Sequence, residues 1–442
     1  DGPAAICATD AKWVLASSDR NGLRPLRYSI TSDDLFFAGS ETGMIKIPEE
    51  KVIEKGKLGP GQIIAIDLKK GKLFKDKEIK DLLAKDYKKY NKQIIDLNKK
   101  ISHEDEKPNF LNEELRKRQY LSGLSIEDLE LILHPMAEEG KEASGSMGDD
   151  TPVAVLSSHF RPVSHYFRQN FSQVTNPPID SLRENKVMSL KTRFGNLGNI
   201  LDFDNLTEEN IYVLDSPILT NSQFKKFKKF FSKKVKIIDC TFNIESSLKE
   251  RIEYIREEAE TAVREGSTCL VLSDKNISDQ KASIPSILTV GAVHSHLVKH
   301  GLRGYCSLNV ECSDAMDTHS FAILIGVGAT TINPYLAIDS IYQRFEKKLF
   351  GKSDFETCVN KFKKSIDAGL LKIMSKMGIS VISSYRGGCN FEAVGLSRAI
   401  VSDYFPGMSS RISGIGIIGI EKKIKELHKK FNAKNVYTLP IG

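Results

Sequence analysis

The chain of 442 residues is 40% hydrophobic and 27% charged, a globular balance that supports large cores and, by length, roughly three domains. Its net charge of +7 lies largely in lysine-rich patches such as Lys225 to Lys236, without the arginine stripe and interleaved aromatics of a nucleic-acid surface. The seven cysteines form no CxxC pair, which argues against a disulfide framework or zinc ribbon and favours a reducing compartment. No apolar run approaches the ~20 residues of a membrane span.

Residues 3 to 66 predict a β-rich region, in which short apolar runs are separated by turn residues. Asn21-Gly22 is by itself a strong hairpin signal between two of these runs. The expected strands are Ala4 to Ala8, Trp13 to Ser17, Tyr28 to Ile30, Leu35 to Ala38 and Gly61 to Asp67.

Residues 69 to 119 differ in composition, because they are rich in lysine and carry apolar residues at rough helical spacing. This pattern predicts an exposed helical linker. A basic membrane-surface helix is the less favoured alternative, since the apolar face lacks large aromatic residues.

The stretch from Leu129 to Leu201 is dense in glycine, proline and carboxylates between apolar runs. We expect a helix from Ile126 to Glu138, then an exposed Gly/Ser turn, then a short strand from Val153 to Leu156. Thr175-Asn176-Pro177-Pro178 excludes a helix, because proline lacks the amide donor and forces the preceding residue into an extended shape. Such a segment suits backbone held for a binding task, and an ordinary surface loop fits it equally well.

Residues 152 to 340 alternate strand-like and helical segments, which predicts an α/β fold with parallel pairing. Polar groups directly follow two of the strands, at Asp215-Ser216 and Ser273-Asp274, where α/β folds bind ligands. The expected strands are Ile211 to Leu214, Val235 to Ile238, Cys269 to Leu272, Ser307 to Val310 and Phe321 to Gly326, and the expected helices are Ser246 to Glu265, Ser286 to Lys299 and Ile341 to Leu371.

A glycine-rich motif, Gly414 to Gly419, matches GxGxxG and precedes a helical pattern. Ser409 to Ser413 is not a convincing strand, and no carboxylate lies near Asn435 to Tyr437. A dinucleotide fingerprint needs both features, so we expect a helix N-terminus after a glycine turn instead.

A group of histidines and cysteines invites a metal-site interpretation, but its separations match no common zinc pattern. We therefore interpret its members as core or interface residues and expect no metal ligand. They are His294, His296, Cys306, Cys312 and His319.

Three long motifs, GSMGDDTP (145–152), QVTNPPID (173–180) and MSLKTRFGNLGNIL (188–201), occur in the order found in the central domain of glutamate synthase. The chain resembles that family over nearly its whole length. DGPAAI, SDRNGLRPLRY and SETGM, near the start, resemble the last part of a class II glutamine amidotransferase domain. In that motif Asn21-Gly22 is not the oxyanion pair of the family, which lies upstream together with the nucleophilic cysteine.

The resemblance implies an α/β central domain, a rudimentary relative of the FMN barrel, preceded by the β-rich end of an Ntn-type amidotransferase domain. The chain starts without Met or signal peptide and ends without a polar tail, so we expect an internal piece of a longer polypeptide. The implied boundaries are 1–68 for the amidotransferase part, 69–119 for the linker, 120–400 for the central domain and 401–442 for a connector into an absent flavin barrel.

The resemblance further implies an enzyme that forms two L-glutamate from L-glutamine and 2-oxoglutarate. Ammonia released at the glutaminase site would cross the protein and add to 2-oxoglutarate, and reduced FMN would supply the hydride. An iron–sulfur cluster would recharge FMN from NAD(P)H or ferredoxin. The implied partners are the rest of the polypeptide and a small NAD(P)H-oxidising subunit or domain, with no nucleic acid and no membrane. A cytoplasmic or plastid-like location is implied, and no targeting signal is visible.

The expected role of this piece is to link the glutaminase and synthase sites, and alone it should be inactive. The resemblance assigns it no catalytic residue. It places Ser146, Met147 and Gly148 at the 2-oxoglutarate and flavin site, and Thr175, Asn176 and Asp180 beside the ammonia tunnel.

Two alternative functions remain open from the residues alone: a non-catalytic scaffold derived from such an enzyme, and a stand-alone class II amidotransferase. The chain also departs from the family, which usually has Ala-Gln-Ile where Gly388-Cys389-Asn390 stands here. This departure puts the role of that turn in doubt.

Overall fold

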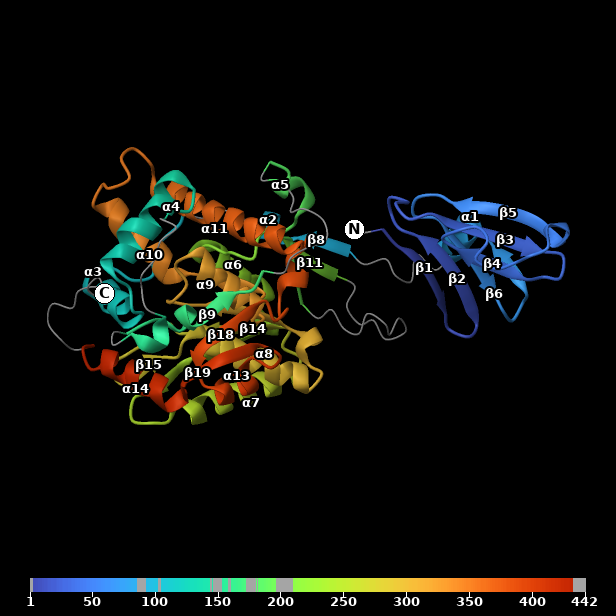
Figure 1. Cartoon of the computed structure of the whole chain (residues 1–442). Coiled ribbons are helices and arrows are strands. Elements are labelled where there is room, and N and C mark those ends of the chain that lie inside the picture. The colour runs from blue at the N-terminus through green and yellow to red at the C-terminus, as the bar shows by residue number, and fades with distance from the viewer. Residues whose placement is uncertain are drawn as a thin grey trace. The chain divides into compact units, whose positions relative to one another are not determined.

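The computed structural model describes residues 3–85, 93–101, 105–143, 145, 153–157, 160–171, 180, 182–195 and 210–431. The chain divides into two compact units, Asp1–Asn91 and Lys92–Gly442 (Figure 1). Within the described residues, no helix combines the length and apolar character needed to cross a membrane.

The first unit consists of two antiparallel sheets with a small apolar core. The side chains of Trp13 and Phe74 contact each other in a second cluster, with ring centroids 5.6 Å apart. All five predicted strands are confirmed, and β5 and β7 add two that the sequence pattern missed. One sheet has the order β1 (Ala5–Thr9), β2 (Trp13–Ser18), β6 (Ile63–Asp67), β7 (Lys72–Phe74), and the other has the order β4 (Phe36–Gly39), β3 (Leu26–Thr31), β5 (Val52–Leu58).

Asn21-Gly22 does not form the tip of a hairpin, because β2 and β3 on either side of it belong to different sheets. The turn is instead organised by the Asp19 carboxylate, which accepts hydrogen bonds from the backbone amides of Asn21, Leu23 and Arg24. These bonds, chiefly those from Arg24 and Leu23, lower the pKa of Asp19 to about 2. The Asp19 side chain therefore sets the shape of this segment, which is not the two-residue hairpin turn that Asn21-Gly22 predicted.

The second unit is built on a parallel sheet with strand order β12 (Val235–Asp239), β14 (Cys269–Ser273), β16 (Ser307–Glu311), β17 (Thr331–Asn333). Parallel neighbours require crossover connections, and helices provide them. The crossovers are α7 (Leu248–Arg264), α8 (Ser286–Lys299) and α9 (Thr318–Gly326), and α10 (Tyr335–Glu346) follows the last strand. Every residue of β14 and β16 is buried, as expected for central parallel strands. The predicted alternation of strands and helices is confirmed.

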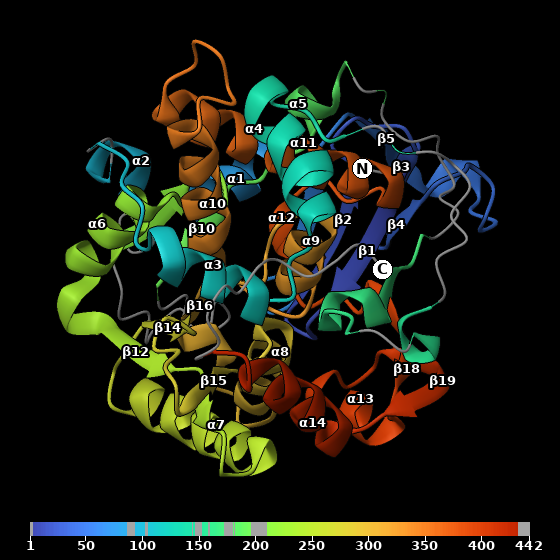
Figure 2. The same cartoon turned by 90° about the vertical axis from the view of Figure 1, so that its left-hand side faces the viewer.

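Other elements surround this sheet, and Figure 2 shows α7, α13 and α14 along one side of the unit. Helices α10 and α11 pack against each other, as do α4 and α11. The remaining strands form the sheets β10 (Thr192–Phe194)–β11 (Asn210–Leu214)–β8 (Gln93–Asp96), β13 (Thr241–Asn243)–β15 (Lys281–Ser283) and β19 (Ser409–Ile415)–β18 (Phe391–Leu396)–β9 (Phe167–Gln169). The remaining helices are α1 (Asp76–Ala84), α2 (Leu97–Lys100), α3 (Asn112–Leu121), α4 (His134–Glu139), α5 (Glu184–Val187), α6 (Asn221–Phe231), α11 (Phe355–Met377), α12 (Ile382–Tyr385), α13 (Arg398–Tyr404) and α14 (Ile417–His428).

Two apolar runs predicted as strands are helical. Phe321 to Gly326 lies inside α9, where the Asp317 carboxylate caps the amide of Ser320 and the helix is buried almost all round. Such a helix lacks the polar face that would distinguish it from a buried strand. Val153 to Leu156 contains a 3-10 turn, Ala154–Leu156, instead of a strand.

The long helix predicted from Ile341 to Leu371 is interrupted. Helix α10 ends at Glu346 and α11 begins at Phe355, and the intervening turn uses positive φ at Lys348 and Gly351. The Asp354 carboxylate then caps the amide of Thr357, which starts the second helix. The helix expected from Ile126 to Glu138 is present as a π-helical segment, Asp128–Leu133, that continues into α4.

The predicted lysine-rich linker is not purely helical. Its first part supplies β7 and α1, and α1 packs against β6 within the first unit. Its later part supplies β8, which pairs in parallel with β11 of the second unit. Lysine side chains can leave a strand or helix for solvent equally well, so composition alone did not separate these elements.

The cysteines are all free among the residues that the structure describes, and they fall into two classes. Cys7 and Cys389 are exposed. The buried ones are Cys240, Cys269, Cys306, Cys312 and Cys358.

Leu308 on β16 is fully buried, so Leu308→Ala should destabilise the second unit by about 2–5 kcal/mol through lost burial and a cavity. Ile237 on β12 is 53% exposed, and Ile237→Ala should cost about 1 kcal/mol or less. Urea unfolding followed by far-UV circular dichroism checks this difference. Trp13 is the single tryptophan and lies in the first unit, so its fluorescence transition should stay in place. This prediction assumes that the two units unfold independently. An equal shift of the circular dichroism and fluorescence transitions in Leu308→Ala would contradict it.

Candidate functional site

The predicted site residues lie mostly outside the described part of the chain. The residues outside the described part are Ser146, Met147, Gly148, Thr175 and Asn176. The remaining one is Asp180, an exposed residue. Its carboxylate accepts hydrogen bonds from the amides of Leu182 and Arg183, both at 3.1 Å. The Arg183 side chain, which pairs with it, lowers the pKa of Asp180. Asp180 therefore holds the turn that leads into α5.

The described residues next to these motifs line one cleft of about 480 Å³. Val153 follows the GSMGDDTP motif, and Phe171 lies just before QVTNPPID. The cleft has cationic, imidazole and amide groups and, among its described residues, no carboxylate. Its lining consists of Val153, Ala154, Arg161, His165, Phe167, Arg168, Gln169, Phe171, His319 and Val394.

His319, in the first turn of α9, is fixed by the backbone of the segment that it faces. Its Nε2 lies 3.0 Å from the carbonyl oxygen of Phe167 and 3.3 Å from that of Ser164. Carbonyl oxygens only accept hydrogen bonds, so Nε2 carries the hydrogen. When the ring is neutral, Nδ1 is therefore left as an acceptor.

Gln169 is fixed from both ends of its amide. Its Nε2 donates to the carbonyl oxygen of Asn390 at 2.9 Å, and its Oε1 accepts from the Tyr385 hydroxyl at 2.6 Å. The Asn390 side chain in turn donates to the carbonyl oxygen of Tyr385. The turn that departs from the family pattern, Gly388-Cys389-Asn390, thus supports one wall of the cleft, and Cys389 adopts a positive φ of 52° within it.

The charge of the cleft is set by arginines and by neutral imidazole. The protein packed around His165 lowers its pKa, and Arg161 and His319 add to the lowering while Asp317 and Asp128 oppose it. His165 is nevertheless an exposed residue, and it lines the cleft. Such a surface suits an anionic ligand, for which Arg supplies charge and imidazole supplies a hydrogen bond.

Sequence reasoning missed these cleft residues, apart from His319, which it interpreted as a core or interface residue. The segment HFRPVSHYFRQ (159–169) carries two histidines and two arginines between the two motifs, and this density was the available signal. Its clustering in space depends on β9 pairing with β18, which joins residues more than two hundred positions apart.

A second polar group lies at the carboxyl edge of the parallel sheet, as the Ser273-Asp274 prediction expected. Burial would raise the pKa of Glu311, but two ammonium groups outweigh it and lower the pKa. Glu311 Oε1 lies 2.8 Å from Lys275 Nζ and 2.9 Å from Lys228 Nζ, and Oε2 accepts from the Ser273 hydroxyl. Glu311, Lys228 and Lys275 line a cavity of about 440 Å³. Lys107 and Lys225 also lie on the wall of this cavity.

Asp274 is buried beside this group and is incompletely paired. Its Oδ2 accepts from the amide and hydroxyl of Ser313, at 3.0 and 2.6 Å, while its Oδ1 has no hydrogen-bond partner. Burial raises the pKa of Asp274 to about 6, and the nearby Asp314 adds to the increase. The second predicted polar position, Ser216, donates to Asp367 at 2.7 Å and remains within the core.

The metal-site group that was set aside does not come together among the described residues. His294 Nδ1 accepts from Arg303 at 3.1 Å, and burial followed by Arg303 and Arg386 lowers the His294 pKa to about 3. His319 faces the cleft. Only His296 belongs to a group with metal-ligand spacing within the described ranges, and its neighbours there are Glu260 and His300.

The glycine-rich motif follows a strand after all, because β19 spans Ser409–Ile415. The expected helix N-terminus is confirmed, with Gly416 as the N-cap of α14. A Cβ at Gly414 would lie 2.2 Å from the carbonyl oxygen of Gly395 on β18. Close packing of two strands therefore accounts for this glycine without a nucleotide.

Two family models match the chain in the order that the motifs indicate. "Glutamine amidotransferases class-II" matches residues 1–92, and "Glutamate synthase central domain" matches residues 117–397. The large chain of an NADPH-dependent glutamate synthase from Azospirillum brasilense is 54% identical over 450 residues. The chain belongs to the glutamate synthase family. The amidotransferase match extends to residue 92, and the first compact unit ends at Asn91.

The alignment with the Azospirillum protein covers 100% of this chain and 30% of that glutamate synthase. The glutamate synthase large chain from Bacillus subtilis is 39% identical, and the alignment covers 97% of this chain and 28% of that protein. A ferredoxin-dependent glutamate synthase from Arabidopsis thaliana is 40% identical, and the alignment covers 94% of this chain and 26% of that protein. The chain thus spans less than a third of each of these relatives. A flavocytochrome b2 structure matches with a TM-score of 0.30 and 11% identity over 66% of this chain and 88% of its own, which is too low to carry an argument.

Asp274→Asn should stabilise the protein at neutral pH. The folded-state pKa of Asp274 is about 6 against an ordinary value of 3.8, so ionisation costs the folded state on the order of 2–3 kcal/mol as the pH rises from about 4 to about 6. Asparagine stays neutral and still offers an acceptor to Ser313. The urea-unfolding free energy of wild type minus that of Asp274→Asn should therefore fall over this pH range. The exposed Glu257→Gln serves as control, and a constant difference would contradict the assignment.

Proposed function

We propose that this chain is the part of a glutamate synthase large chain that connects the glutaminase site to the synthase site. The observation that carries the proposal is the order of the two matched regions, because an amidotransferase region directly precedes a glutamate synthase central domain. Relatives that share this order over nearly the whole chain are named glutamate synthases, with NADPH or ferredoxin in their names. They do not favour a stand-alone amidotransferase or a scaffold.

In the proposed reaction, glutamine is hydrolysed to glutamate and ammonia, and ammonia condenses with 2-oxoglutarate to 2-iminoglutarate and water. Two electrons and two protons, delivered as a hydride to carbon and a proton to nitrogen, then reduce the imine to a second glutamate. FMN, when bound, supplies the hydride. The described cysteines offer no group of three with ligand spacing, so they do not fit an iron–sulfur cluster, and we assign that cluster to other parts of the polypeptide.

The cleft between the two motifs supports a role for this chain near the substrate. Arg161 and Arg168 supply positive charge, and the dicarboxylate 2-oxoglutarate is the substrate that such a surface would attract. His319 and Gln169 have fixed hydrogen-bond directions, so they can orient a ligand without reorganising. The donor set fits an anionic group, including a flavin phosphate. The finer fold assignment, a relative of the FMN barrel, rests on the parallel β/α alternation and on the family resemblance.

The assignment of Thr175, Asn176 and Asp180 to the ammonia path gives the test of the connecting role. In the complete polypeptide, Thr175→Phe should obstruct ammonia, so that glutamine hydrolysis exceeds imine reduction. The ratio of 2-oxoglutarate consumed to glutamine hydrolysed should fall clearly below one, while Thr175→Ser keeps it near one. The ratio is measured with NADPH or reduced ferredoxin as donor. Unchanged coupling in Thr175→Phe would reject the path, and no glutamate formation by the unmodified polypeptide would reject the function.

The assignment of Ser146, Met147 and Gly148 to the synthase site predicts a different effect. Methionine is flexible and polarizable, and flanking glycines let the backbone approach a ligand closely. Met147→Ala should raise the KM for 2-oxoglutarate by roughly tenfold, equivalent to about 1.4 kcal/mol of lost binding, while sparing glutaminase activity. Leu156→Ala, at a 77% exposed position nearby, is the matched control. A lower melting temperature with an unchanged KM would show that Met147 only packs.

A further inference from the structure

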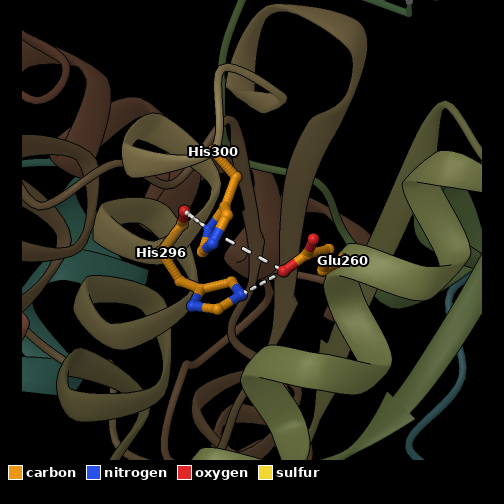
Figure 3. A group of neighbouring side chains, drawn as sticks. All are labelled: Glu260, His296 and His300. Carbon is orange, nitrogen blue, oxygen red and sulfur yellow. Dashed lines mark hydrogen bonds and ion pairs between the residues drawn. The ribbon is translucent and has the colours of Figure 1, made fainter.

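Helices α7 and α8 bring together three side chains whose atoms could bind a metal ion. Glu260 lies in the last turns of α7, His296 in the last turn of α8, and His300 is the C-cap of α8. Figure 3 shows both imidazoles turned toward the Glu260 carboxylate. One ligand atom from each residue can be chosen so that all three lie within 4.8 Å of one another. The group is separate from the cleft and from the carboxyl-edge cavity described above.

The residue types and spacing match zinc chemistry. His296 and His300 are four positions apart, which places both rings on one face of a helix. Two such histidines with one carboxylate form a three-ligand set that leaves a position for water. Zinc bonds of about 2.0–2.2 Å would hold neighbouring donor atoms roughly 3.3 Å apart. His296 Nε2 is 2.7 Å from Glu260 Oε2, and His300 Nδ1 is 3.7 Å from it, so both separations lie close to that value.

The surroundings also suit a cation. Helices α7 and α8 each return from the carboxyl end of a parallel strand, so they run in the same direction and their C-terminal ends lie at the same edge of the sheet. Helix C-termini carry partial negative charge, which favours a bound cation. A guanidinium nitrogen of Arg264 lies 2.8 Å from Oε1 of Glu260. This contact orients the second oxygen of the Glu260 carboxylate, Oε2, toward the two histidines.

A hydrogen bond to the Glu260 carboxylate accounts for His296, but it does not account for the position of His300 beside the same carboxylate. The Arg264 side chain, followed by that of His296, lowers the pKa of Glu260, as expected for a carboxylate with two donors. The Nδ1–H of His300 donates a hydrogen bond to the carbonyl oxygen of His296 at 2.9 Å, and the His300 side chain is 36% exposed. Its ring can therefore turn to present a nitrogen to an ion, at the cost of one exposed hydrogen bond.

We propose that Glu260, His296 and His300 form a binding site for a divalent transition-metal ion, with Zn²⁺ the best match, across the C-terminal ends of α7 and α8. The site lies at the amino edge of the parallel sheet, opposite the edge where α/β folds carry out chemistry. An ion there would join two helices that cover the sheet. The proposal does not depend on the function proposed above.

The test is a titration of the metal-free, tag-free 442-residue chain with Zn²⁺, followed by calorimetry. The two exposed thiols are first removed by Cys7→Ser and Cys389→Ser, so that they cannot bind the metal. We expect one equivalent of Zn²⁺ to bind. His300→Ala and Glu260→Gln should each weaken that binding by at least about tenfold.

The matched controls lie on the same helices. Lys299→Ala replaces the exposed neighbour of His300, and Glu257→Gln replaces an exposed carboxylate on α7, so both should keep the wild-type affinity. Co²⁺ absorption provides a second readout, since its visible bands report coordination by these side chains rather than stability. No stoichiometric binding by the parent chain, or equal affinity in His300→Ala and Lys299→Ala, would overturn the proposal.

Discussion

Four parallel strands, three of them buried along their whole length, are the constraint on which the second unit depends. Parallel neighbours cannot be joined by tight turns, so each strand must be followed by a helix that returns across the sheet. As a result, all strands end at one edge, and the first polar residues after them meet there. Glu311 shows the consequence, because a carboxylate at a buried strand end is stable as an anion only with Lys228 and Lys275 against it.

The same geometry divides the unit into regions of different electrostatic character. The carboxyl edge gathers buried acids with compensating ammonium groups, and Asp274 is left partly unpaired. The cleft beside β9 lies outside this sheet and carries guanidinium and imidazole groups without a described carboxylate. The opposite edge presents the C-terminal ends of α7 and α8. A ligand's charge therefore decides which of these regions can hold it.

The sequence predicted what depends on local pattern. Strand and helix alternation from residue 211 onward was visible because β-branched runs and amphipathic helices such as Ser246 to Glu265 differ in period. The buried helix α9 was mistaken for a strand because its polar face is missing, and β19 was overlooked because its residues are mostly polar and exposed. The Asn21-Gly22 turn was misjudged because a side chain, Asp19, decides its shape.

The candidate site was predictable only in part. The Ser273-Asp274 position could be found because it follows a recognisable strand. The cleft could not, because His319 and Gln169 are positioned by carbonyl and hydroxyl partners that are distant in sequence. The same holds for Glu260, which reaches His296 and His300 only after two helices pack side by side. Pairings of this kind depend on tertiary structure, which no local window contains.

The distribution of thiols has a practical consequence. Burial raises the pKa of all five buried cysteines, so they stay protonated and react slowly. The two exposed ones, Cys7 and Cys389, fall in different units. The natural chain therefore already carries one accessible attachment point for a maleimide dye in each unit. A donor and acceptor pair attached there would report, by energy transfer, the distance between the two units in solution.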